Sequence, residues 1–149
     1  MKARPILSAF VISFWLAGCA ATTSGGTPSN VPLPTDLKVS APPDSVPPEV
    51  RAFSGKWVGT WDAGLAHVLV VEDIPSADRV TVVYAFGSNQ FVRTPGFTRV
   101  RGTIASGKLN FKLSNGAVVT YVLTPSDDLK AEYERPGEIV RATMKRVQE

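Results

Sequence analysis

The chain has 149 residues, of which 44% are hydrophobic, and it carries 16 Lys and Arg against 13 Asp and Glu, with one His and one Cys. Charges this close to balance give no reason to expect a nucleic-acid partner, and a single Cys excludes a disulfide within the chain. A single His also excludes a multi-histidine or cysteine-rich metal centre and leaves only a carboxylate-dominated ion site. We interpret the acidic pairs of the chain as solvated surface, and we therefore expect no metal and no cofactor.

The N-terminus has the pattern of an export signal. Lys2 and Arg4 precede an apolar run from Ile6 to Gly18, and small residues follow this run. The run is shorter than the roughly 20 apolar residues that a membrane-spanning helix needs. We therefore predict that residues 1–18 are a signal peptide, and its removal brings the acidic and basic charges still closer to balance.

The only cysteine lies at the end of this signal. Leu16, Ala17, Gly18 and Cys19 resemble the lipobox of bacterial lipoproteins. The resemblance implies cleavage before Cys19, a diacylglyceryl group on its sulfur, and acylation of the new amino group with a fatty acid such as palmitate. Two or more acyl chains hold a protein stably at a bilayer, whereas one chain does so only marginally. The alternative is an ordinary signal peptide with an incidental cysteine.

The residue after the cysteine bears on localisation. In lipoproteins of bacteria with two membranes, Asp at this position retains the protein at the inner membrane, and this chain has Ala20 there. The resemblance thus implies a cell-envelope protein at the outer membrane, facing the periplasm, with the membrane as its partner through Cys19.

Residues 19–50 are predicted to be a linker. The segment is rich in Pro, Ser, Thr and Gly, which favour a semi-rigid spacer of polyproline character and neither a helix nor an internal strand. At roughly 3 Å per residue, such a spacer would hold a domain several tens of Å from the lipid. Residues 51–149 have the composition and size of one folded domain.

This domain shows the periodicity of β-strands and no helical stripe. Alternation is clearest where Leu109, Phe111 and Leu113 share one face, and pairs such as Ser106-Gly107 suit short antiparallel connections. Because closure removes the free edges of a sheet, we predict an all-β, antiparallel up-and-down barrel of about eight strands. The expected strands are Gly55–Trp61, Leu65–Asp73, Arg79–Phe86, Thr98–Ala105, Lys108–Leu113, Ala117–Thr124, Leu129–Glu134 and Ile139–Arg146.

The first of these strands carries a short family signature. Its residues Trp57-Val-Gly59-Thr-Trp61 are similar to the Gly-X-Trp motif that opens lipocalins and related calycin-like barrels. The resemblance implies that a basic side chain late in the last strand packs across the tryptophan and closes one end of the barrel. The candidates for this contact with Trp61 are Arg141, Lys145 and Arg146. The alternative is that both tryptophans only fill the core.

Motifs that would indicate catalysis are weak. The stretch Gly102–Lys108 matches a phosphate-binding loop, but Leu109 stands where Ser or Thr would bind magnesium, so we predict a β-hairpin. His67 lies in an apolar strand, which favours a structural histidine, and no G-x-S-x-G motif is present. We therefore expect no enzymatic activity.

One region between the predicted strands combines basic and aromatic residues. No acidic residue lies between Asp78 and Asp127, and the loop Gly87–Phe97 is the longest connection in that interval. A loop of this kind at a barrel rim suits a ligand or an anionic surface; the alternative is a solvated positive face. The predicted site has Arg99 and Arg101 as charge partners, Phe91 and Phe97 as a lid, and Tyr84 in the lining.

The expected function is non-catalytic binding of a small amphipathic or anionic ligand at the barrel mouth. The alternative is a module with a filled barrel that presents its rim to another envelope protein, for example as an inhibitor of a lysozyme or a protease. An empty or filled interior distinguishes these two hypotheses.

Overall fold

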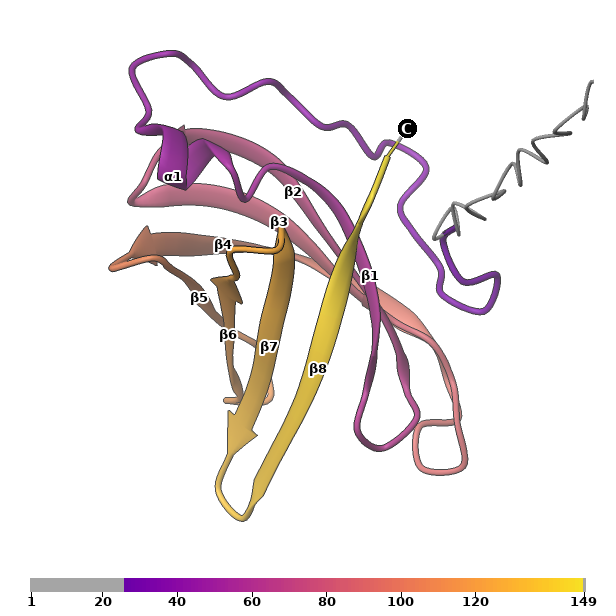
Figure 1. The fold of residues 1–149 in the computed structure, drawn as a ribbon. Helices are drawn as coiled ribbons and strands as arrows, with labels where there is room; N and C mark the ends of the chain where they lie inside the picture. The colour runs from indigo at the N-terminus through magenta and orange to yellow at the C-terminus, as the bar shows by residue number, and fades with distance from the viewer. Residues whose placement is uncertain (1–25, 149) are drawn as a thin grey trace, which may run out of the picture.

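Eight antiparallel strands close into a barrel (Figure 1). The structure is a computed structural model, and it describes residues 26–148. Each strand pairs with the next one along the chain, and β8 pairs with β1. The all-β up-and-down barrel that the sequence predicts is therefore confirmed. The predicted signal peptide and Cys19 lie outside the described residues.

The strands lie where the hydrophobic alternation predicts them, with ends that differ by a few residues. Within residues 26–148 no helix is long and apolar enough to cross a bilayer. The hairpin over Ser106 and Gly107 is confirmed, because both residues have the positive φ of a tight turn, 52° and 72°. The elements are α1 (Pro48–Arg51), β1 (Gly55–Trp61), β2 (Ala66–Ser76), β3 (Arg79–Phe86), β4 (Gly96–Ala105), β5 (Lys108–Lys112), β6 (Val118–Leu123), β7 (Asp128–Arg135) and β8 (Glu138–Val147).

The helix α1 corrects the expectation that residues before Val50 form no helix. Its first residue is Pro48, a position where proline is tolerated because the missing N–H has no intrahelical partner. The chain around α1 closes one end of the barrel, since Val46, Val50 and Phe53 are buried in the same cluster as the barrel interior. We call this the closed end.

Arg146 of β8 stacks on Trp57 at the closed end. The guanidinium carbon lies 4.0 Å from the centre of the Trp57 ring, and the group donates hydrogen bonds of 2.7 Å to the carbonyl oxygens of Ala52 and Ser54. The Trp57 indole N–H donates to the Phe53 carbonyl oxygen at 3.0 Å. A basic residue late in the last strand thus covers a tryptophan, but the tryptophan is Trp57.

The expected partner of that basic residue, Trp61, lies elsewhere for a geometric reason. In the β1–β8 register, Trp57 is opposite Arg146 and Trp61 is opposite Ala142. Four residues of a strand span roughly 13 Å, which places Trp61 toward the other end of the barrel.

Residues 28–50, which we call the strap, run along the outer wall of the barrel (Figure 1). Val31 is buried against outward-facing valines of β2 and β3, and Leu33 and Leu37 pack on the same cluster. The cluster on the wall comprises Val68, Val70, Val83 and Ala85. The expectation of an extended spacer is therefore wrong for residues 28–50, which pack against the barrel.

Polar contacts hold the strap on the wall. The Arg99 guanidinium donates to Glu72 of β2 at 2.7 Å and to Asp36 of the strap at 3.0 Å. Hydrogen bonding to Arg99 holds the pKa of Asp36 below its usual range. The backbone N–H of Ser40 donates to the Glu72 carbonyl oxygen at 2.7 Å. Arg99 therefore links β2, β4 and the strap.

Candidate binding site at the open end of the barrel

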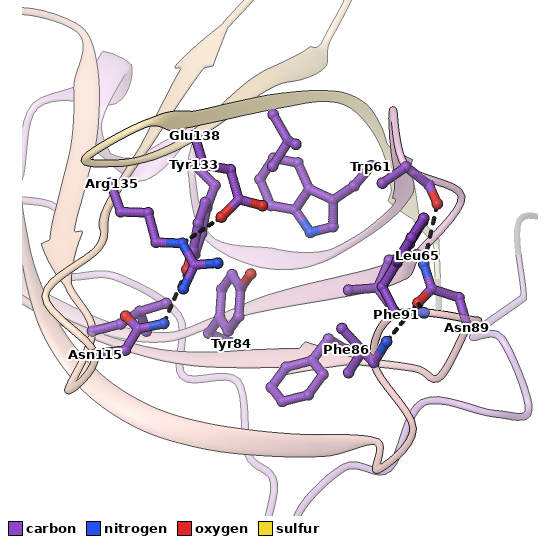
Figure 2. A pocket seen from close by; sticks show the side chains of 14 residues that line it. Trp61, Leu65, Tyr84, Phe86, Asn89, Phe91, Asn115, Tyr133, Arg135 and Glu138 are labelled. Carbon is purple, nitrogen blue, oxygen red and sulfur yellow. Dashed lines mark hydrogen bonds and ion pairs between the residues drawn. The ribbon is translucent and has the colours of Figure 1, made fainter.

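The end of the barrel opposite α1 holds a cavity of about 540 Å³ (Figure 2). Eight-stranded barrels leave room for side chains or for one small ligand, and this volume lies within the range of small-molecule sites. Side chains from the β1–β2 turn, the β3–β4 loop, the β5–β6 turn and the β7–β8 turn surround the opening. The lining is Trp61, Ala63, Leu65, Tyr84, Phe86, Asn89, Phe91, Val92, Leu113, Asn115, Tyr133, Arg135, Glu138 and Val140.

The walls of this cavity are mainly apolar because inward-facing positions of the strands carry aliphatic and aromatic side chains. Tyr84 and Phe86 come from β3, and their rings lie 6.1 Å apart. Val140 of β8 and Leu113, which follows β5, contribute aliphatic surface. Apolar walls of this kind favour a ligand with a large hydrocarbon part.

Trp61 presents an unpartnered donor in this cavity. The residue is 3% exposed, and its indole nitrogen has no hydrogen-bond partner among the described residues. Figure 2 shows the indole directed into the space near Tyr84. A buried donor without an acceptor costs about 1–3 kcal/mol, so the cavity favours a ligand that supplies an acceptor atom.

The Tyr84 hydroxyl group lies close to this donor. Burial raises the pKa of Tyr84 above its usual value, and the neighbouring Tyr133 raises it further. The nearby Trp61 N–H offsets part of the rise, although it makes no hydrogen bond of normal geometry with the hydroxyl oxygen. The hydroxyl group is therefore neutral at physiological pH and is able to donate as well as accept a hydrogen bond. Tyr84 lies in the lining, where the sequence predicts it.

Polar groups at the rim of the cavity are partnered with one another (Figure 2). Arg135 forms an ion pair with Glu138 across the β7–β8 turn. The Asn115 side chain donates to the Tyr133 hydroxyl oxygen at 2.9 Å. With its basic group neutralised, the rim offers little attraction to an anion.

Asn89 organises the β3–β4 loop beside the opening. Its side-chain oxygen accepts hydrogen bonds from the backbone N–H groups of Phe91 and Val92, at 2.9 and 2.8 Å. Its amide nitrogen donates to the Ala63 carbonyl oxygen at 3.1 Å, which ties the loop to the β1–β2 turn. The loop therefore holds Phe91 at the mouth.

His67 lies among the aromatic side chains of the interior and is fully buried. Its ring stacks on Trp61 with centroids 5.0 Å apart. The Ala85 carbonyl oxygen accepts from Nδ1 at 2.7 Å, so Nδ1 carries the proton and Nε2 accepts from the Tyr121 hydroxyl group, also at 2.7 Å. Both nitrogens are satisfied, which confirms the prediction of a structural histidine.

Acid is expected to destabilise the barrel through His67. Burial lowers the pKa of His67 to about 4, from 6.5 when it is exposed. Between these two pKa values the unfolded chain binds a proton at His67 and the folded chain does not. The free energy of unfolding is therefore highest above pH 6.5 and falls by up to about 3 kcal/mol as the pH is lowered to about 4. Urea denaturation between pH 7 and pH 4 measures this slope. His67→Gln should flatten it, and an unchanged slope in this variant would contradict the assignment.

Three of the predicted site residues do not line the cavity. Successive side chains of a strand point to opposite faces, and in β4 the inward set includes Gly102 and Ile104. Phe97, Arg99 and Arg101 consequently lie on the outer wall. The expectation that Arg99 and Arg101 are charge partners of a ligand in the mouth is therefore not supported, and Arg99 is engaged with the strap.

Phe91 and Tyr84 are the predicted site residues that the structure brings into the cavity. Leu65, Tyr133 and Val140 also line the cavity, and the sequence did not predict them there. Their signal is their position, because Tyr133 and Val140 are paired inward-facing residues near the β7–β8 turn, and Leu65 lies in the β1–β2 turn at the same end of the barrel. This end becomes identifiable only when the direction of every strand is known.

No match for this chain is found among models of known protein families, among curated proteins or among solved structures. The site is therefore assigned from its geometry. Within residues 26–148, no three His, Cys, Asp or Glu side chains gather in a way that would hold a metal ion.

Proposed function

We propose that this protein is a lipid-anchored envelope protein whose barrel binds one small amphipathic molecule without transforming it. The ligand has a hydrocarbon part that fills the apolar cavity and an acceptor atom that meets the Trp61 N–H. The observation that carries this proposal is the unpartnered, buried indole nitrogen in a cavity of about 540 Å³.

The absence of reactive groups in the lining supports binding without turnover. The residues around the cavity include no Ser, Thr, Cys, Lys or His, and their one carboxylate, on Glu138, is paired with Arg135. Of the two tyrosines in the lining, burial keeps Tyr84 protonated, and the Tyr133 hydroxyl oxygen accepts from Asn115. Nucleophilic and general acid–base catalysis depend on such groups within reach of the ligand.

The anchor and the location are part of the same proposal. The lipobox resemblance at Leu16 to Cys19 supports a lipidated cysteine, and Ala20 supports delivery to the outer membrane. The closed eight-stranded barrel, with Arg146 packed across Trp57, supports a lipocalin-like module. Incorporation of labelled palmitate that is lost in Cys19→Ser tests the anchor.

The acceptor requirement is testable with two ligands of similar shape. Benzophenone carries a carbonyl oxygen that diphenylmethane lacks, so the wild-type protein should bind benzophenone more tightly. In Trp61→Phe the donor is absent, and we expect a two- to tenfold weaker benzophenone affinity, about 0.5–1.5 kcal/mol for one hydrogen bond. Isothermal titration calorimetry measures both affinities.

The control for this experiment is internal. Diphenylmethane binding should change less than twofold in Trp61→Phe, because its contacts are only apolar. Equal losses for both ligands would show that the substitution disturbs the cavity shape, and equal wild-type affinities would refute the role of the indole N–H. Native mass spectrometry of protein extracted from its host then identifies the natural ligand by mass.

A further inference from the structure

The rim of the open end carries most of the exposed large hydrophobic side chains of residues 26–148. Phe91 in the β3–β4 loop is 73% exposed, and Phe97 at the start of β4 is 46% exposed. Val118 and Ile139, at the starts of β6 and β8, are 43% and 51% exposed. We call these four residues the apolar rim. Elsewhere in the described chain, the exposed large hydrophobic residues are Val39 and Val122.

Exposed hydrophobic residues that are scattered singly need no explanation, whereas a cluster around one opening marks an interaction surface. The four rim residues come from three separate connections, so no single loop accounts for them. They share only their place at the mouth, next to the turns that bear the cavity lining.

The strap brings the N-terminal part of the chain to this same end. Asn30 lies against Gly87, so close that a β-carbon on Gly87 would be 2.7 Å from the Asn30 amide nitrogen. Gly87 directly follows Phe86, the last residue of β3, whose side chain lines the cavity. Val46, in contrast, is buried at the closed end. The strap therefore starts on the wall near the mouth and ends at the closed end.

The length of chain between the cysteine and the strap limits how far the mouth is from a lipid surface. Cys19 precedes Asn30 by eleven residues, which span at most about 40 Å when fully extended. A tether that short gives the rim a high effective concentration at the bilayer.

We propose that the open end of the barrel is a membrane-contact surface, with the apolar rim seated in the interface of the bilayer that carries the anchor. This inference rests on the lipid anchor at Cys19 proposed above. It also names the source of the ligand, because a cavity that opens onto lipid exchanges its amphipathic occupant with the bilayer.

The charges around the mouth fit contact with lipid. Arg135 and Glu138 neutralise each other, and Arg93 is exposed on the loop that carries Phe91. Lys112 and Glu134 lie on either side of Val118 in the sheet and bring opposite charges to the outer wall. When an aromatic ring inserts into the bilayer, a long basic side chain beside it keeps its charge at the level of the headgroups. The contact is therefore driven mainly by apolar burial, with a modest contribution from anionic lipid.

The test uses the full lipidated protein reconstituted into phosphatidylethanolamine and phosphatidylglycerol vesicles that contain doxyl-labelled lipid. Cys19 is the only native cysteine, and the proposed diacylglyceryl thioether blocks its sulfur, so an introduced cysteine takes an environment-sensitive fluorophore alone. Gln90→Cys places the label beside Phe91, and Ala105→Cys places it at the closed end of β4 on an exposed position.

We expect doxyl lipid to quench the label at residue 90 at least threefold more than the label at residue 105. Adding Ile139→Ser to Gln90→Cys should reduce this quenching at least twofold, whereas Val122→Ser, which alters an exposed valine away from the mouth, should leave it unchanged. Equal quenching at the two sites, or stronger quenching at residue 105, would overturn the proposal.

Two further readouts separate this inference from the proposed function. Flotation of the unlabelled protein with vesicles reports the anchor, and a chain that does not float refutes the anchor and the membrane contact together. Floating protein without selective quenching refutes the membrane contact alone. Benzophenone binding in the absence of vesicles reports the cavity independently of both results.

Discussion

Trp57→Ala is expected to lower the free energy of unfolding by about 3–5 kcal/mol, the range for removing a fully buried large aromatic side chain. Trp57 has no exposed surface, and its ring joins three parts of the closed end. It packs in the interior, lies under the Arg146 guanidinium at 4.0 Å, and donates to the Phe53 carbonyl oxygen at 3.0 Å. Truncation leaves a cavity at the closed end and removes the hydrogen-bond donor of the Phe53 carbonyl group.

Urea denaturation followed by circular dichroism at pH 7.5 measures this loss, since His67 is neutral there in both the folded and the unfolded chain. Phe91→Ala is the matched control, because this aromatic residue is 73% exposed and should change stability by less than about 0.5 kcal/mol. A loss below about 1 kcal/mol in Trp57→Ala would contradict the role of the closed end as the part that stabilises the barrel.

Val140→Trp should reduce binding of benzophenone at least a hundredfold while the barrel stays folded. Val140 faces the cavity from β8, and an indole there occupies much of the volume of about 540 Å³ that a ligand needs. Because the cavity opens to solvent, the larger side chain has room without overpacking the interior. Calorimetric titration measures the affinity, and the circular dichroism spectrum reports the fold.

The neighbouring residue supplies the control for this substitution. Ile139 lies one position earlier in β8, so its side chain points outward, and it is 51% exposed. Ile139→Trp makes a comparable change in size outside the cavity and should alter benzophenone affinity less than twofold. Tight binding in Val140→Trp would show that ligands bind elsewhere, which would leave the filled-barrel interaction module as the better description.

The fold was largely predictable because its signals are local. Strand alternation and turn pairs such as Ser106-Gly107 depend on residues close together in the chain, and they locate eight strands. Antiparallel hairpins make sequence neighbours into spatial neighbours, so the order of strands follows from the order of the chain. Closure follows from the cost of free edges.

The strap was not predicted, although the sequence contains a signal for it. Residues 68–71 of β2 are apolar at consecutive positions, which indicates burial on both faces of the strand. One face is the barrel interior, and the other needs a cover. The proline-rich segment supplies this cover with Val31, Leu33 and Leu37, while its composition alone favours an exposed spacer.

The site shows where reasoning from sequence stops. Composition alone identifies a basic stretch in which Arg99 and Arg101 occur, but the face of β4 on which they lie depends on register, and register is set by pairing with β3. The difference of a single residue separates the interior from the outer wall. Phe91 and Phe97 are divided in the same way, the first in the cavity lining and the second outside it.

The sequence by itself determined the lipobox resemblance, the strand number and the turns, because each of these depends on residues within a few positions of one another. Only the tertiary structure decided that Arg146 covers Trp57, that Arg99 holds the strap, and that the Trp61 N–H faces an open cavity. These are contacts between residues far apart in the chain. They arise from barrel closure and register, which the pairing of all eight strands establishes together.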